Sequence, residues 1–255
     1  KNKSKKEFIN KFKKILDKGE FVGGEEIKKF EKNISRLCQT KYAVALNSGT
    51  DALTLALHLF GVRPGDEVIT PPNSFIASTA VIVHLGAKPV FADVLDDQII
   101  DPSKIEKLIT KKTKVIMPVH LSGRMAQMDK IMRIANKYGI KVVEDAAQSI
   151  GSKYKNKMAG SAGHAGCFSA HPLKNLSALG DAGFLTTNNF DIYNKVKNLS
   201  NHGIENRNKV KNFGYVSRMD NLQAAFLNYK LKNLNRIIKI RRRNAALYFK
   251  QLDKR

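Results

Sequence analysis

The feature that most constrains the fold is an alternation of short apolar runs with amphipathic segments. The short runs are rich in β-branched residues and bounded by Gly, Pro or Asp, which is typical of buried strands. They cover residues 43–46, 66–71, 88–94, 114–121, 141–147, 166–170 and 183–187. Between them, apolar residues recur at helical spacings in residues 50–60, 76–86, 102–110, 128–139 and 192–200. The alternation predicts an α/β fold with a mostly parallel sheet covered on both faces.

The alternation ends near the C-terminus. After residues 214–220 (GYVSRMD), the apolar spacing of residues 221–255 predicts one long amphipathic helix that runs to the last residue. We therefore expect a large α/β domain, with its N-terminal segment, over residues 1–235. Residues 236–255 are expected to begin a C-terminal domain that is largely absent from this chain.

The composition leaves two classes of partner open. The 255 residues are 42% hydrophobic, which is enough for a sizeable core, and 45 Lys and Arg against 22 Asp and Glu give a net charge of +23. A non-catalytic polyanion-binding protein would carry such a charge. However, the cations are mostly lysines spread along helices, without the clustered arginines and aromatics that read bases. We expect no specific nucleic-acid binding, and a positive surface that attracts small anionic substrates.

Cysteine usage and hydropathy bear on location. Cys38 and Cys167 lie far apart and form neither a disulfide framework nor a CxxC pattern, so we predict no metal site and a reducing compartment. The basic N-terminal segment lacks the continuous apolar core of a signal peptide. No stretch has the apolar length of a membrane span. The expectation is a cytoplasmic protein without membrane contact.

In sheets of this kind ligands bind at the carboxyl ends of strands, so the residues after each strand are candidate site residues. After residues 43–46 comes NSGTDAL, where small and hydroxyl residues enter a helix. Backbone N–H groups there, with the Ser48 and Thr50 hydroxyls, would form an anion cradle. The alternative is an ordinary helix cap with Thr50 as the capping residue.

Two further strand ends carry candidates. Phe75 opens a helix after a Pro-rich turn and could stack on a flat ligand ring, or else pack in the core. Glu144 and Asp145 end a buried strand, where a carboxylate is costly without a cationic partner. A protonated pyridine nitrogen would be such a partner, and an ion pair or a helix cap is the alternative.

The last candidate is Lys174, which follows residues 166–170 through a turn restricted by Pro172. A single lysine in this lysine-rich chain is more often a solvated surface residue. Near an anion cradle and an aromatic side chain, however, its amine can form a Schiff base. A cradle, a stacking aromatic, an acid and an amine, in this order, together describe a pyridoxal phosphate site.

Seven motifs, in collinear order over nearly the whole chain, resemble one family. They are NSGTDALTLAL (47–57), GDEVITPPNSFIAS (65–78), GAKPVFADV (86–94), PVHLSGRMAQM (118–128), VVEDAAQSIGS (142–152), HPLKN (171–175) and GYVSRMDNLQAA (214–225). They are similar to the DegT/DnrJ/EryC1/StrS family of pyridoxal phosphate-dependent sugar aminotransferases. The resemblance implies fold type I, like aspartate aminotransferase, and a role in amino-sugar and polysaccharide biosynthesis.

The resemblance also implies roles for single residues. Lys174 matches the lysine that binds the cofactor covalently, and Asp145 matches the acid that pairs with the pyridine nitrogen. The cofactor-binding positions that it implies are Gly49, Thr50, Asp51, Phe75, Asp145, Gln148, Ser169 and Lys174. Among these, Asp51 matches a position that contributes its backbone N–H. Family members are homodimers with active sites at the subunit interface.

One departure concerns that interface. Val216 stands where the family has an Asn that reaches the partner subunit's phosphate, and Ser217 or Arg218 is expected to replace this contact. The resemblance implies transfer of an amino group from an amino acid, expected to be glutamate, to a nucleotide-linked keto sugar. A sugar dehydratase is an alternative that Lys174 argues against, since those relatives carry a histidine there. An aminohydroxybenzoate synthase is a second alternative.

Overall fold

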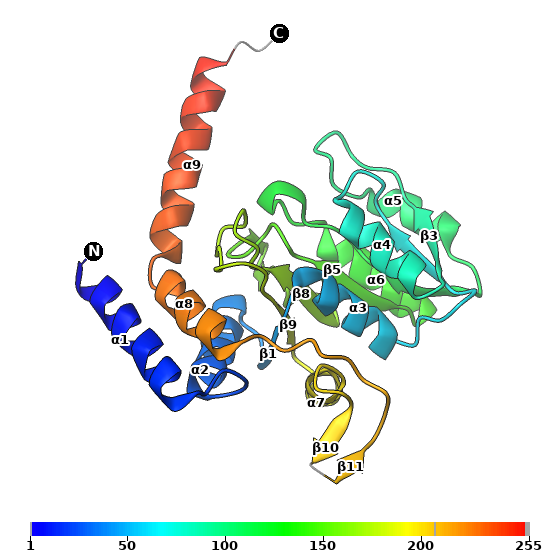
Figure 1. Cartoon of the computed structure of the whole chain (residues 1–255). Helices are drawn as coiled ribbons and strands as arrows, with labels where there is room; N and C mark the ends of the chain where they lie inside the picture. Colours follow the sequence, from blue (N-terminus) through cyan, green and yellow to red (C-terminus); the bar gives the residue numbers. More distant parts are fainter. Residues whose placement is uncertain (1, 207, 253–255) are drawn as a thin grey trace.

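The computed structural model describes residues 2–206 and 208–252, and its centre is a seven-stranded sheet (Figure 1). The strands are β1 (Tyr42–Leu46), β2 (Glu67–Thr70), β3 (Lys88–Phe91), β4 (Thr113–Ile116), β5 (Lys141–Asp145), β8 (Ala165–Ser169) and β9 (Gly183–Thr187). Their order is β1-β9-β8-β5-β4-β2-β3, and β9 runs in the direction opposite to that of the other six strands. The predicted mostly parallel sheet, with each of its predicted strands, is confirmed.

Helices cover both faces of this sheet. One face carries α3 (Gly49–Leu59), α4 (Ile76–His84) and α7 (Phe190–Leu199). The other carries α2 (Glu25–Cys38), α5 (Pro102–Ile105), α6 (Met128–Tyr138) and α8 (Asn221–Leu231). Strand side chains alternate between the two cores, so that Val143 packs with the α3 side and Val142 with the α2 side. The sheet is therefore buried on both faces, as continuous apolar strands require.

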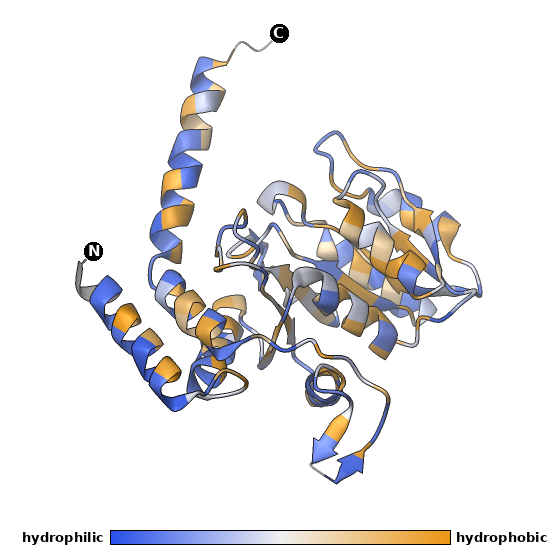
Figure 2. Cartoon of the chain, in the orientation of Figure 1, coloured by the Kyte–Doolittle hydropathy of each residue, from blue (hydrophilic) through white to orange (hydrophobic). Residues whose placement is uncertain are grey.

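The predicted helical segments are helical, with one interruption. Residues 102–110 contain α5 followed by a 3₁₀ turn, η1 (Glu106–Leu108). The N-terminal amphipathic segment forms α1 (Asn2–Lys18), whose Phe8 ring packs against Phe226 and Tyr229 of α8 at centroid distances of 5.4 and 5.7 Å. Figure 2 shows polar residues along one side of α1 and apolar residues along the other. The segment thus docks on the body through its apolar side.

Some elements were not predicted. Helix α2 was not, although its buried Phe30, Ile34 and Cys38 recur every four residues. Small elements also join the main ones: the hairpins β6 (Lys153–Tyr154) with β7 (Lys157–Met158) and β10 (Ile204–Asn206) with β11 (Lys209–Val210), and the turn η2 (Leu121–Gly123).

The prediction of one long helix after residue 220 is wrong, because α8 ends at Leu231 and α9 (Leu234–Gln251) begins after a break. Burial on both sides of the break explains it. Leu227 and Asn228 of α8 are buried on the body, and Leu234 is buried again just beyond. Asn233 lies in the break with φ −108° and ψ −3°, and asparagine readily leaves the helical conformation. Beyond Leu234, α9 turns away from α8 (Figure 1).

Two structural observations concern the hydropathy of the helices and the state of the cysteines. Among the described residues, no helix is both long and apolar enough to cross a bilayer. Cys38 and Cys167 are free and buried, and burial raises the pKa of Cys38 to about 12 and that of Cys167 well above its ordinary value. Both thiols are therefore held protonated inside the core.

Candidate active site

The carboxyl ends of β1, β2, β4, β5 and β8 meet at one edge of the sheet, and a cavity of about 380 Å³ opens there. Most of the predicted cofactor-binding residues line it, and Asp51 is the exception. The lining residues among them are Gly49, Thr50, Phe75, Asp145, Gln148, Ser169 and Lys174. Residues scattered over more than 120 positions of sequence thus face one space. The topology of the sheet brings them together, as the sequence argument required.

The wall nearest β1 is the N-terminus of α3. Ser48 is the capping residue, and its Oγ accepts a hydrogen bond from the Asp51 N–H at 3.0 Å, so Thr50 as cap is wrong. The N–H groups of Gly49 and Thr50 have no hydrogen-bond partner among the residues that the structure describes. Two free donors and the positive end of the helix dipole therefore face the cavity and favour an anion there.

Asp51 lies just behind this wall. Its N–H is already donated to Ser48, and its Oδ2 accepts a hydrogen bond from the Ser217 hydroxyl at 2.7 Å. The predicted role of the Asp51 N–H in anion binding stays a prediction, and it requires Ser48 to release that N–H. The Asp51 side chain instead ties the helix start to the segment that contains Ser217, which is buried.

Two glycines let β8, β9 and the start of α3 approach closely. A Cβ on Gly49 would lie 2.7 Å from Ser169 Cβ, and a Cβ on Gly183 would lie 2.2 Å from the carbonyl carbon of Ser48. Real Cβ atoms do not come so near, so both positions need glycine. The close packing brings Ser169 against Gly49, and both residues line the cavity together with Thr50.

Asp145 forms the floor of the cavity at the end of β5. Its side chain points to the α4 side of the sheet, where Oδ2 accepts a hydrogen bond from the Ser78 hydroxyl at 2.7 Å. Its Oδ1 accepts the Ala147 N–H at 3.1 Å. Burial raises the pKa of Asp145, while these hydrogen bonds and the nearby charge of Lys174 act against the rise. The carboxylate is thus hydrogen-bonded, without an ion-pair partner among the described residues, and suits a cationic ligand.

Glu144 points to the opposite face, because side chains alternate along a strand. Its Oε2 accepts hydrogen bonds from His120 Nε2 at 2.8 Å and the Gly160 N–H at 2.9 Å. Its Oε1 accepts the N–H groups of Ala162 and Gly163 at 2.8 and 2.6 Å. Glu144 therefore holds the 160–163 loop behind the sheet.

His120 is also fully buried there and lies outside the cavity. The Ala126 N–H donates to its Nδ1 at 3.2 Å, which leaves Nε2 as the nitrogen that donates to Glu144. His120 and Glu144 form a satisfied internal pair.

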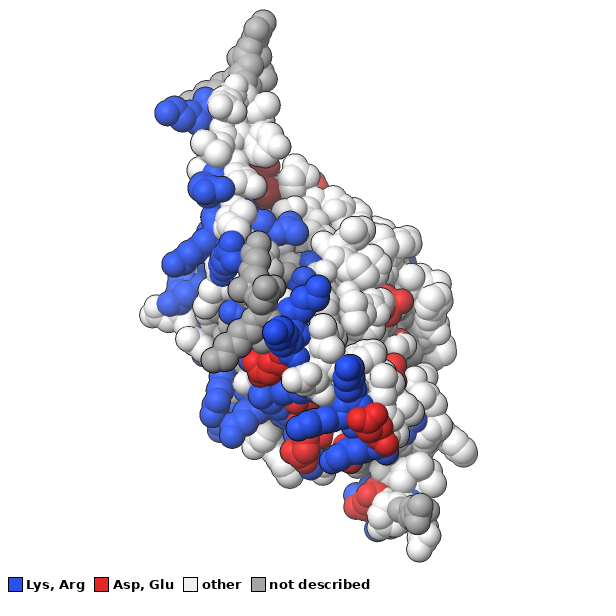
Figure 3. Space-filling model, turned by 60° about the vertical axis from the view of Figure 1, so that its left-hand side comes forward, with Lys and Arg blue, Asp and Glu red and all other residues white. Residues whose placement is uncertain are grey.

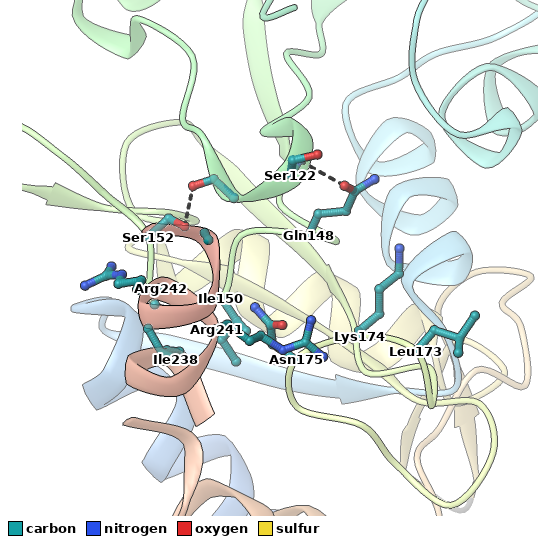
Figure 4. Close-up of a pocket in the computed structure, with 13 residues that line it drawn as sticks. Ser122, Gln148, Ile150, Ser152, Leu173, Lys174, Asn175, Ile238, Arg241 and Arg242 are labelled. Atoms are coloured by element: carbon teal, nitrogen blue, oxygen red, sulfur yellow. Dashed lines mark hydrogen bonds between the residues drawn. The ribbon is translucent and has the colours of Figure 1, made fainter. Parts of the chain in front are cut away.

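Phe75 and Gln148 flank the opening. The Phe75 side chain is 65% exposed at the start of α4, so its interpretation as a core residue is wrong. It is free to cover a flat ligand. Gln148 Oε1 accepts the Ser122 N–H at 2.9 Å, which leaves the amide nitrogen on the cavity side (Figure 4).

Lys174 follows a tight turn after β8. The His171 N–H donates to Ser169 Oγ at 3.2 Å, and the Lys174 N–H donates to the His171 carbonyl at 2.8 Å. These bonds fix the position of Lys174 relative to Ser169. The Lys174 side chain extends into the cavity beside Gln148 (Figure 4).

Three polar residues that line the cavity have no predicted role: Ser78, His171 and Asp181. Each is close in sequence to a motif residue: Ser78 follows Phe75 by one helical turn, and His171 is within the HPLKN motif. Helical spacing after Phe75 was a signal that could have found Ser78. Asp181 lies in the glycine-bracketed turn before β9, where Gly180 adopts φ +110° as a tight turn requires.

Comparison with known proteins shows to which family the chain belongs. The model of the DegT/DnrJ/EryC1/StrS aminotransferase family matches residues 2–255. The chain belongs to this family. It is 40% identical over 98% of its length to a pleiotropic regulatory protein of Geobacillus stearothermophilus, and covers 67% of that protein. It is 38% identical over 87% of its length to dTDP-3-amino-3,4,6-trideoxy-alpha-D-glucose transaminase of Streptomyces venezuelae, and covers 59% of it.

Solved structures of related proteins have the same fold. A DegT DnrJ EryC1 StrS aminotransferase from Brucella abortus matches with a TM-score of 0.92 and 33% identity, over 97% of this chain and 69% of that one. A Bacillus subtilis protein, NtdA, solved with bound cofactor PMP matches with a TM-score of 0.85 and 39% identity, over 92% of this chain and 54% of that one. The predicted fold class is confirmed. The chain spans about two thirds or less of the length of these curated relatives.

Proposed function

We propose that the chain binds pyridoxal phosphate and transfers an amino group from an amino acid, expected to be glutamate, to a nucleotide-linked keto sugar. The observation that carries the proposal is the shared cavity of Lys174, Asp145 and the free N–H groups at the start of α3. An anion cradle, an exposed aromatic ring, a buried acid that lacks a cation, and an amine fit the four parts of this cofactor. The transaminase relatives and the PMP-bound structure support the same assignment.

Bound pyridoxal phosphate supplies an electron sink for negative charge on the carbon that carries the amino group. This chain's residues do the rest. The Gly49 and Thr50 N–H groups and the Ser169 hydroxyl bind the phosphate. Asp145, which is buried and shielded from water, would hold a proton on the pyridine nitrogen.

The amine of Lys174 binds the cofactor. When free, it moves a proton as a general base within the cavity. Phe75 covers the ring and excludes water from it. Gln148 supplies a polar contact beside it.

We also propose that the chain acts as a homodimer with shared sites. Two large apolar side chains that line the cavity, Phe75 and Leu173, are 65% and 83% exposed, and Val216 is 60% exposed. Ser217 and Arg218, the expected substitutes for the missing Asn, are both engaged inside this chain. The Ser217 hydroxyl bonds Asp51, and Arg218 Nη1 donates to Asn201 Oδ1 at 2.7 Å. In such a dimer, Val216 would lie near the partner subunit's phosphate and would donate no hydrogen bond to it.

An amino-transfer assay tests the function. The chain loaded with pyridoxamine phosphate is mixed with a panel of nucleotide-linked keto sugars and with cyclic keto acids that carry no nucleotide, and amino products are measured. We expect an amino sugar with at least one nucleotide-linked acceptor. Products from the cyclic keto acids alone would point to the aminohydroxybenzoate alternative. No product, with salt-sensitive nucleic-acid binding that survives Lys174→Ala, would favour the polyanion-binding alternative.

A further inference from the structure

A second cavity, of about 500 Å³, adjoins the first. Gln148, Leu173 and Lys174 line both, so the two spaces meet at the reactive lysine. Its opposite wall is helix α9 (Figure 4). Apart from Gln148 and Lys174, the residues that line this space have no predicted role.

One face of α9 forms that wall. Ile238, Arg241, Arg242 and Ala245 line the cavity, and their spacing of three, four and seven residues places them on one side of a helix. Gly151 explains why this side is turned inward. A Cβ at Gly151 would lie 2.7 Å from Ile238 Cδ1, so the absence of a side chain there lets Ile238 dock on the loop after β5. Arg241 and Arg242 follow one turn later.

The charge of the cavity is entirely positive. Its lining includes Lys174, Arg241 and Arg242, and no Asp or Glu. Within the described part of the chain, neither arginine forms a salt bridge. Figure 4 shows the Arg241 guanidinium beside Asn175. Guanidinium groups without a carboxylate partner, next to an amide and a lysine, suit a ligand with several oxyanion oxygens.

We propose that this cavity binds the diphosphate group of a nucleotide-linked sugar, with Arg241 and Arg242 as its charge partners. The inference rests on the proposed function, because it places the keto sugar at Lys174 and the diphosphate one cavity away. The arginine fork matches phosphate oxygens in pairs. The volume of about 500 Å³ is within the range of roughly 300–1,000 Å³ for sites that hold drug-sized ligands.

The wider surface favours the same ligand. Lys and Arg side chains gather on the face that carries α1 and α9 (Figure 3). Such a field raises the local concentration of anions and speeds their encounter with the site.

The test compares two charge-matched double variants of the cofactor-loaded chain. Arg241→Gln with Arg242→Gln removes the cavity pair. Lys239→Gln with Arg243→Gln removes two cations of the same helix that do not line the cavity. Inorganic pyrophosphate is titrated by calorimetry. We expect the cavity variant to bind it about 10- to 100-fold more weakly than wild type, and the control variant to stay within about twofold.

Glutarate, a stand-in for the amino donor, is titrated in parallel. Unchanged glutarate affinity in the cavity variant supports the diphosphate assignment, and a loss for glutarate without a loss for pyrophosphate overturns it. Equal pyrophosphate binding by both double variants also overturns it. If the two double variants bind pyrophosphate equally but Lys174 carries the cofactor, the proposed function stands and only the diphosphate site is refuted. If Lys174 carries none, the proposed function fails independently of the pyrophosphate result.

Discussion

The Ser78 hydroxyl donates a 2.7 Å hydrogen bond to Asp145 Oδ2 beneath the candidate cofactor cavity. The two residues are 67 positions apart, and both are buried. This bond joins the first turn of α4 to the end of β5. It also favours the ionised form of Asp145, which is the form that holds a proton on a pyridine nitrogen.

Replacement of Ser78 tests this link. Ser78→Ala removes a hydrogen bond to a charged group, so the pKa of Asp145 should rise further. Such a bond is worth about 1.5–3 kcal/mol. We expect pyridoxal phosphate to bind roughly tenfold more weakly, as measured by absorbance titration. Ser74→Ala, whose hydroxyl meets only the Phe75 carbonyl at 3.4 Å, is the control and should bind normally. Equal binding by both variants would contradict the link.

The ionised side chain of Asp145 should lower the free energy of unfolding when no cofactor is bound. Because burial raises its folded-state pKa, the folded protein binds this proton more tightly than the unfolded chain does. The ionised group therefore lowers stability above that pKa, and the loss disappears as the pH falls and the group is protonated. In the cofactor-free chain, Asp145→Asn should raise Tm at pH 7 by about 2–4 °C, or on the order of 1 kcal/mol.

The pH dependence is the sharper part of this prediction. The Tm difference between Asp145→Asn and wild type should shrink as the pH falls toward the ordinary carboxyl range. A difference that stays constant with pH, or a variant less stable than wild type at pH 7, would contradict a raised pKa at Asp145. Thermal unfolding at several pH values measures it.

Glu144 should be needed for folding. Each of its two oxygens accepts two hydrogen bonds, so Glu144→Gln turns an NH₂ toward two donors in either orientation. We expect a loss of about 3–5 kcal/mol in the free energy of unfolding, measured by urea denaturation. Glu31→Gln is the matched control, because Glu31 accepts only the Ala45 N–H and glutamine keeps that acceptor. It should cost no more than about 1 kcal/mol. Similar losses in the two variants would refute the assignment.

Gly49 should be needed for the anion cradle. A methyl group there would lie 2.7 Å from Ser169 Cβ and push β8 away from α3. Gly49→Ala should cost about 1–3 kcal/mol and abolish the protection that added inorganic phosphate gives in a thermal scan. Thr54→Ala, one turn along α3 and outside the cavity, should keep that protection. Full protection in Gly49→Ala would show that the close packing does not shape the cradle.

The strands could be predicted from the sequence, since β-branched runs such as 141–145 carry their own local signal. The opposite directions of Glu144 and Asp145 follow from the strand period, but which carboxylate faces the cavity depends on which helices cover each face. Ser48 and Thr50 are both capping residues by type, so only the backbone distinguishes them.

Two features could not be predicted from the sequence because they depend on contacts between distant parts of the chain. The break between α8 and α9 depends on burial of Leu234 against the body, while residues 221–251 contain no Gly or Pro that would mark a helix end. The presence of Arg241 in the wall of the second cavity goes with the packing of Ile238 against Gly151, a residue 87 positions earlier in the chain that has no side chain. The division into residues 1–235 and 236–255, and the cytoplasmic location, stay predictions.

The central claim is that Lys174 is the residue that binds the cofactor. The measurement is incubation of the chain with pyridoxal phosphate, reduction with borohydride, and mass mapping of the peptides, with Lys174→Ala as the control. We predict the mass of the reduced cofactor on the peptide that contains Lys174, and none on the corresponding peptide of the variant. Label spread over other lysines at equal levels, or label absent from the Lys174 peptide, would contradict the account.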